Sequence, residues 1–239
     1  MSAHVLDPAP RAASRRWFVW PLRALYVLGA LLVVGVLAFA TFKPLRVMPR
    51  ISLAPGFAFT NQAGVVRTSE DYRGKVTLYS FSYTGCGAGC PQTADQLAAF
   101  RERLAANKPQ GIDVALVTIS VDPEHDTPEA LARMAATYPG DPAIPWDWLT
   151  GDPLKTKYAV GGGFNVYYDK KAGDPTAIRF EPHFVLVDGW GIIRADYRTS
   201  QLDQALVMRD LQSIADEARN STGVARVAYE AAHVFRCYQ

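Results

Sequence analysis

The sequence predicts an α/β sandwich, built on a mixed central sheet, behind one N-terminal membrane-spanning segment. Apolar β-rich runs alternate with helical patterns through the middle of the chain, as expected for helices that cover both faces of a sheet. Residues 112–121 form a nearly continuous β-branched run, which is typical of a strand buried on both faces. Residues 24–42 contain no charged side chain, close to the length of about 20 residues that a membrane-spanning helix needs.

The membrane segment has two interpretations. Four arginines precede it and three basic residues follow it, so the positive-inside rule favours an internal N-terminus. We therefore expect a cytoplasmic tail at 1–23 and a single-pass anchor at 24–42 in the cytoplasmic membrane of a bacterium, with the rest in the periplasm or outside. Alternatively, residues 14–19 resemble a twin-arginine export signal and residues 38–40 a cleavage site. The anchor is favoured because the apolar run exceeds the usual signal core of about 7–15 residues.

The elements of the globular part are predicted as follows. A proline-containing linker covers 43–55, and a domain covers 56–218. It begins with a hairpin over 57–66 that turns at 61–64. Strands follow at 76–83, 112–121 and 146–150, with a helix after each: the first opens at Pro91, the second has Thr127 as its N-cap before Pro128, and the third covers 153–158. A flexible glycine loop at 161–163, a strand at 180–188, its hairpin partner at 192–197 and a helix at 202–218 complete the domain.

Residues 219–239 continue beyond this domain. Apolar side chains recur there every three or four positions, while Arg226, Glu230, His233 and Arg236 lie on the other side, so we expect an amphipathic helix. It either packs back on the domain or docks on a partner or the membrane surface.

Charge excludes one class of function. Residues 1–50 hold seven Lys or Arg and one acid, which leaves 18 basic and 22 acidic residues, a net of −4, in the remainder. A nucleic-acid-binding domain would carry clustered Lys and Arg. We therefore expect no nucleic-acid partner.

The motif Cys86-Gly-Ala-Gly-Cys90-Pro91 stands between the strand at 76–83 and the following helix. At a helix N-terminus the partial positive charge favours thiolate over thiol. Two thiolates one turn apart can close a disulfide or hold one soft metal ion. A purely structural pair of buried cysteines is the alternative. The third cysteine, Cys237, is distant, and we expect it to remain unpaired with the other two.

Three blocks of sequence resemble one family. They are Ser82-Tyr-Thr-Gly-Cys-Gly-Ala-Gly-Cys-Pro91, Thr118-Ile-Ser-Val-Asp-Pro-Glu-His-Asp-Thr-Pro-Glu129, and Trp148-Leu-Thr-Gly-Asp152 followed by Tyr167-Tyr168. Over about residues 50–215 the chain resembles the Sco/SenC family, membrane-anchored proteins of thioredoxin-like fold that act in cytochrome c oxidase assembly. The Cys-x-x-x-Cys-Pro spacing separates this family from ordinary thioredoxins.

The resemblance implies a copper metallochaperone. Copper, Cu(I) or Cu(II), would be bound by Cys86, Cys90 and His183 and delivered to the oxidase subunit that carries the binuclear CuA centre. His183 is the expected histidine because it opens a late strand, where the family's ligand histidine lies. Pro182 stands before it where the family commonly has an aspartate, and the loop between the cysteines lacks the family's usual proline and acidic residue.

The other polar and aromatic residues of these blocks are expected to serve the fold and not the chemistry of the site. His125 lies in an acidic loop and is expected to be solvated, and Asp122 and Asp126 are read as carboxylates near a helix start. Trp146, Trp148, Tyr167 and Tyr168 are expected at the core and rim of the domain.

Two other functions remain open. One is a thiol–disulfide oxidoreductase that uses Cys86 and Cys90 as a redox pair to reduce a partner's cysteines, without metal. The other is a structural accessory subunit of a membrane respiratory complex, which would contact its neighbours through the anchor and the C-terminal helix.

Overall fold

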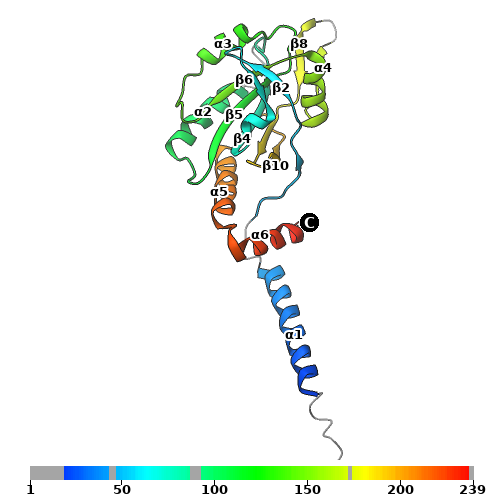
Figure 1. Cartoon of the computed structure of the whole chain (residues 1–239). Coiled ribbons are helices and arrows are strands. Elements are labelled where there is room, and N and C mark those ends of the chain that lie inside the picture. Colours follow the sequence, from blue (N-terminus) through cyan, green and yellow to red (C-terminus); the bar gives the residue numbers. More distant parts are fainter. Residues whose placement is uncertain (1–18, 43–46, 87–92, 172–173, 237–239) are drawn as a thin grey trace, which may run out of the picture. The chain divides into compact units, whose positions relative to one another are not determined.

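The computed structural model describes residues 19–42, 47–86, 93–171 and 174–236. The chain divides into two units, Met1–Leu45 and Arg46–Gln239. The first contains helix α1 (Val19–Phe42) (Figure 1). Its segment Val19–Ala38 has a mean hydropathy of 2.0 and is long and apolar enough to cross a membrane, a test that a signal sequence near an N-terminus also passes.

The second unit contains a mixed eight-stranded sheet among its described residues, in the order β1-β10-β9-β4-β5-β6-β2-β3. Strands β4, β5 and β6 are parallel, and β9 runs antiparallel beside β4. The strands are β1 (Ser52–Leu53), β2 (Ala58–Asn61), β3 (Val66–Thr68), β4 (Lys75–Ser82), β5 (Asp113–Ser120), β6 (Trp146–Thr150), β9 (Phe184–Val187) and β10 (Ile192–Tyr197). The helices are η1 (Ser69–Tyr72), α2 (Thr93–Ala106), α3 (Pro128–Ala136), α4 (Pro153–Thr156), η2 (Lys157–Gly163), α5 (Gln204–Asn220) and α6 (Gly223–Arg236).

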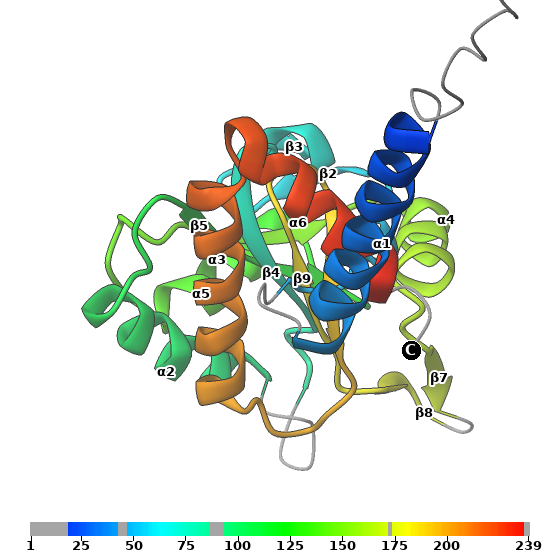
Figure 2. The ribbon, with the colours of Figure 1, turned by 90° about the horizontal axis from the view of Figure 1, so that it is seen from below.

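Each face of the sheet carries its own core. Alternate residues of the central strands point to opposite faces, so Leu78 and Leu116 enter one core while Phe81 and Val117 enter the other. Apolar residues of α2, α3 and α5 cover the first face, and residues of η2 cover the second. Figure 2 shows α2 and α5 on one side of the sheet and α4 on the other. The predicted α/β sandwich on a mixed sheet is therefore confirmed.

Local signals in the sequence place several elements correctly. The hairpin of β2 and β3 turns where expected, because the Asn61 side chain accepts hydrogen bonds from the backbone N–H groups of Ala63 and Val65. Helix α3 begins after Thr127, whose hydroxyl accepts a hydrogen bond from Ala130 N. Pro128 occupies the first turn, where its missing N–H leaves no bond unmade.

Two predictions of local structure were wrong. The glycines at 161–163 do not form a loop, because α4 continues as the π-helical segment η2 to Gly163. The strand expected at 180–188 is divided by residues 181–183. Its first residue ends β8 (Asp174–Phe180), which pairs with β7 (Tyr168–Lys171) in a separate two-stranded sheet. Its remainder forms β9. The break leaves His183 directly before β9, which is the position that matters for the site.

A buried group of charges joins the linker, β10, α5 and α6. The Arg194 guanidinium is 3% exposed and binds the carboxylates of Asp188 and Glu217 at 2.9 and 2.6 Å. It also donates to the backbone oxygens of Met48 and Pro49. His233 of α6 is hydrogen-bonded to the other oxygen of Glu217 at 2.9 Å. We call these residues, Met48, Pro49, Asp188, Arg194, Glu217 and His233, the base network.

Candidate functional site

The first cysteine of the motif lies just past the end of β4. Cys86 N donates a hydrogen bond to the Tyr83 carbonyl at 3.2 Å, so the chain turns tightly as it leaves the strand. Cys86 packs, partly buried, against the core that contains Phe81 and Tyr83. Cys90 and Pro91 lie outside the described residues, and α2 begins at Thr93. The described residues thus confirm the predicted strand before the cysteine motif and a helix after it.

The expected histidine lies beside this end of β4. Ser80 of β4 pairs with Phe184 of β9, so the residue before Phe184 is brought next to Phe81. The His183 ring is fully buried and meets the Phe81 ring edge-on at a centroid distance of 6.4 Å. Cys86 follows the end of β4, and His183 precedes the start of β9. Because these neighbouring strands are antiparallel, the two residues lie at the same edge of the sheet although they are 97 positions apart in the sequence.

The two nitrogens of His183 have different surroundings. Nε2 is hydrogen-bonded to Oδ1 of Asp196 on β10, whose Oδ2 accepts from Arg198 Nε at 3.1 Å. Nδ1 is buried and has no hydrogen-bond partner among the residues that the structure describes. A buried polar atom without a partner costs about 1–3 kcal/mol, which makes it a marker of a site that binds something.

The chemistry of these residues fits a soft metal ion. A neutral imidazole with one nitrogen held by a carboxylate and the other free of partners is the usual arrangement of a metal-binding histidine. Thiolate and imidazole are the ligands that Cu(I) prefers. Within the described residues, no three His, Cys, Asp or Glu side chains form a metal-binding group, and Cys90 lies outside them.

A buried carboxylate supports the loop that carries Cys86, and sequence reasoning missed its position. Asp126 is 1% exposed, and its oxygens accept hydrogen bonds from Thr84 N at 3.1 Å, from the Thr84 hydroxyl and from Ser120 Oγ at 2.6 Å. Burial raises the pKa of Asp126 above its ordinary value of 3.8. Asp126 stands directly before the N-cap of α3, near a helix start as expected, but it is buried and connects the end of β5 to the residue two positions before Cys86. Its spacing six residues after Ser120 gave no signal of this contact.

His125, in the same loop as Asp126, is largely exposed to solvent, as expected from the sequence. The His125 side chain is 57% exposed and pairs through Nδ1 with the buried carboxylate of Asp122 at 2.9 Å. The aromatic residues lie partly in the core and partly at the surface: Trp146 and Trp148 are buried and stacked on each other, while Tyr167 is 56% exposed. Of the other histidines, His233 belongs to the base network, and His4 lies outside the described residues.

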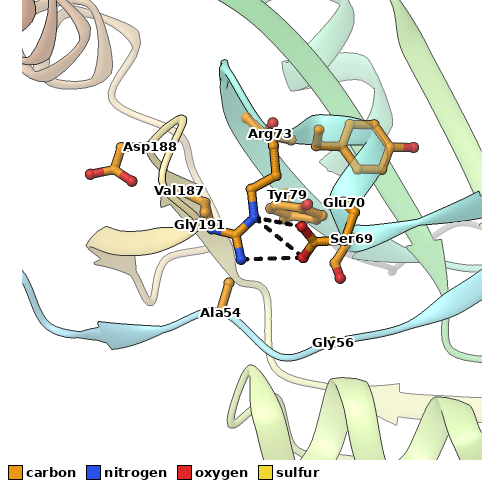
Figure 3. A pocket seen from close by; sticks show the side chains of 11 residues that line it. Ala54, Gly56, Ser69, Glu70, Arg73, Tyr79, Val187, Asp188 and Gly191 are labelled. Atoms are coloured by element: carbon orange, nitrogen blue, oxygen red, sulfur yellow. Dashed lines mark hydrogen bonds and ion pairs between the residues drawn. The ribbon is translucent and has the colours of Figure 1, made fainter.

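A small cavity lies near the start of β4 (Figure 3), and Cys86 is not among the residues that line it. Its volume is about 90 Å³, and Thr77 and Tyr79 of β4 line it together with Asp188 and the ion pair of Arg73 with Glu70. The Thr77 hydroxyl is buried and has no hydrogen-bond partner among the described residues. A cavity of this size and polarity suits water molecules.

The fold and this edge of the sheet define a class: a thioredoxin-like domain with a cysteine motif after a central strand and a buried histidine beside it. The model of the SCO1/SenC family matches residues 48–216. The chain belongs to that family, which confirms the resemblance stated on its sequence motifs.

Individual relatives agree with this assignment. The chain is 32% identical over 142 residues to the SCO1 protein homolog of Bacillus subtilis, covering 59% of this chain and 71% of that protein. The solved structure of BsSco, described as a member of the Sco family of cytochrome c oxidase assembly proteins with a disulfide switch, is 28% identical with a TM-score of 0.61 and covers 71% of this chain and 97% of that chain. The structure of Arabidopsis thaliana ScoI with copper bound is 25% identical with a TM-score of 0.58, over 68% and 98%.

Proposed function

We propose that this protein is a membrane-anchored copper metallochaperone for the CuA centre of cytochrome c oxidase, with copper as its cargo. Cys86, Cys90 and His183 hold the ion. The observation that carries the proposal is the buried Nδ1 of His183, which lacks a partner among the described residues and lies at the edge of the sheet from which the thiol loop leaves. The copper-bound Arabidopsis relative and the oxidase assembly role of the BsSco family support the cargo and the partner.

The three ligands have different tasks. Two thiolates give a soft pair that selects Cu(I) over harder cations, and the neutral imidazole completes a set that also accepts Cu(II). The histidine comes from a strand far along the chain, so the set exists only in the folded domain. Helix α1 anchors this domain in the bacterial cytoplasmic membrane, with the copper site on the outer side, where its oxidase partner presents the acceptor.

A second candidate function is thiol–disulfide exchange, in which Cys86 and Cys90 reduce a partner's disulfide. Cys86 is disulfide-bonded in the structure, which favours a pair able to cycle. Closing a disulfide removes two electrons from the pair and leaves neither sulfur as a thiolate ligand. Copper binding and disulfide formation therefore exclude each other, and the oxidised protein takes up no Cu(I).

One experiment separates the two functions. The full chain is purified in detergent, reduced without oxygen, and titrated with copper beside Cys86→Ala, Cys90→Ala and His183→Ala, with Cys237→Ala as the matched control. We expect one copper per chain in the parent and in Cys237→Ala, and loss of tight binding in either of the other cysteine variants. His183→Ala keeps Cu(I) on two thiolates but weakens Cu(II) binding more severely. Copper also raises the melting temperature of the parent.

The opposite result is equally clear. Reduced parent protein that binds no copper but exchanges disulfides with a substrate would exclude the chaperone and leave the oxidoreductase.

A further inference from the structure

A histidine can bind a metal through either ring nitrogen, and the surroundings of His183 choose between them. We propose that Asp196 is the positioning residue that makes Nδ1 of His183 the copper-binding nitrogen, by holding the ring proton on Nε2. This inference rests on the proposed copper function and goes beyond it, because it assigns a role to a residue outside the ligand set.

The hydrogen-bond chemistry gives the proton's place. A carboxylate is an acceptor only, so the nitrogen that faces Asp196 must be the one that carries hydrogen. Nε2 of His183 is that nitrogen. A histidine must be neutral to bind a metal, and a neutral ring has one N–H, so in that form Nδ1 presents the lone pair. That atom is the buried one that has no hydrogen-bond partner in the described part of the chain.

Asp196 is itself held in place. Arg198 Nε donates to its second oxygen at 3.1 Å, so each oxygen of the carboxylate has one partner. The side chain is 27% exposed, while His183 is fully buried. The carboxylate thus lies at the boundary between solvent and core, with its Oδ1 directed at the ring. Asp196 is the only carboxylate hydrogen-bonded to His183 among the residues described.

A register shift in the sheet brings Asp196 to this position. Ile193 pairs with Val187, but Ala195 pairs with Leu186, so β10 gains one residue over β9 between them. After the shift Asp196 pairs with Val185, which packs in the same core as Phe81. Without it, Asp196 would face Phe184 and point to the opposite side of the sheet. Bulges re-aim side chains in this way beside functional sites.

The local sequence before His183 offers no equivalent. Pro182 has no side-chain acceptor, and Glu181 is exposed. The acid that orients the ring therefore comes from the neighbouring strand, and a pattern search confined to residues near His183 would miss it.

The first test observes the ring itself, without copper. Full-length protein with ¹⁵N-labelled histidine is reduced in detergent, and the His183 signals are identified with a His183→Gln variant. We expect the parent to carry its proton on Nε2. Asp196→Asn can donate an N–H to Nε2 and so should transfer part of the population to the Nδ1–H form. Asp113→Asn is the matched control, since its exposed carboxylate pairs with Lys108 at the other end of β5 and should change nothing.

The second test observes bound Cu(II) in the same proteins. Asp196→Asn should weaken Cu(II) binding about 10–100-fold, the usual cost of removing a partner that orients a metal-binding histidine. If Asp196 acts through His183, the substitution should have no further effect in a His183→Ala background, because coupled residues are not additive. The Asp113→Asn protein should bind like the parent.

Each outcome decides the matter. A parent whose His183 carries the proton on Nδ1, or an Asp196→Asn protein with the parent's Cu(II) affinity, overturns the inference. Equal losses from Asp196→Asn in the parent and in the His183→Ala background also overturn it, because the residue would then act elsewhere. A parent that binds no copper overturns the proposed function instead, and the ¹⁵N spectra still decide whether Asp196 sets the proton.

Discussion

Two buried histidines, His183 and His233, each pair with a carboxylate in a different region of the domain, and the two pairs differ in what surrounds them. In the base network, Glu217 receives His233 on one oxygen and Arg194 on the other, and the Arg194 guanidinium also binds Asp188 and backbone oxygens. At the thiol end, Asp196 holds one nitrogen of His183 while the other lacks a partner among the described residues. The first pair ties four segments together. The second leaves a lone pair available for a ligand, which is why we place function there.

The largest effect should follow from breaking the base network. Arg194→Met leaves the buried carboxylate of Asp188 without its cation and Glu217 with only the longer contact to Arg50 at 3.7 Å. Removal of one partner from a buried ion pair costs about 3–5 kcal/mol. Urea unfolding of the full chain in detergent measures the loss. Arg209→Met, which removes an exposed arginine, is the control and should cost less than about 1 kcal/mol. A loss below that level for Arg194→Met would mean that the network is not what joins these segments.

At the thiol end, removing both partners should cost less than removing one. Asp196→Leu alone leaves Nε2 of the buried His183 unpaired, at about 1–3 kcal/mol. The double variant His183→Leu with Asp196→Leu replaces both polar groups, and its free energy of unfolding should stay within about 1 kcal/mol of the parent. Tight Cu(II) binding should disappear in it. A double variant less stable than Asp196→Leu would show that this pair holds the fold together as the base network does.

Substitution of Asp126 should have a smaller effect on the free energy of unfolding, and this effect should depend on pH. Burial raises its folded pKa, so the folded state retains the proton to higher pH than the unfolded state does. Its stabilising contribution is complete below the ordinary value of 3.8 and is lost as pH rises through the raised folded pKa. Asp126→Asn should therefore gain stability relative to the parent as pH rises from 3.8 to neutrality. Unfolding at a series of pH values checks this, with Asp113→Asn as the exposed control, and a relative stability that falls with pH would contradict it.

The smallest effect should be at the rim of the base network. Glu230 of α6 binds Arg50 through two hydrogen bonds at 2.9 and 3.0 Å, but both side chains are at least one-third exposed. Water competes for such pairs, so Glu230→Gln should change the free energy of unfolding by less than about 0.5 kcal/mol. A loss comparable with that of Arg194→Met would place the attachment of α6 at Arg50 rather than at Glu217.

Signals that lie within a few residues of each other predicted much of the fold. The Thr127 cap, the Asn61 turn and the buried runs of β4 and β5 were correct because each depends on the residue's own neighbours. The glycines at 161–163 were misread because packing of Ala159, Val160 and Phe164 into the core carries the helix through them. Tertiary packing commonly overrides a local preference for a turn.

The sequence by itself determined the cysteine motif, the alternating α/β pattern and the family, since these depend on residue type and spacing. It also singled out His183, through the family resemblance. Only the tertiary structure decided that His183 has a partner on Nε2 and none described on Nδ1, because that partner, Asp196, comes from β10 by way of a one-residue shift in register. The same holds for Asp126, whose burial beneath Thr84 depends on β4 and β5 lying side by side. Hydrogen bonds between strands are set by sheet order and register, and neither can be read from the spacing of residues along the chain.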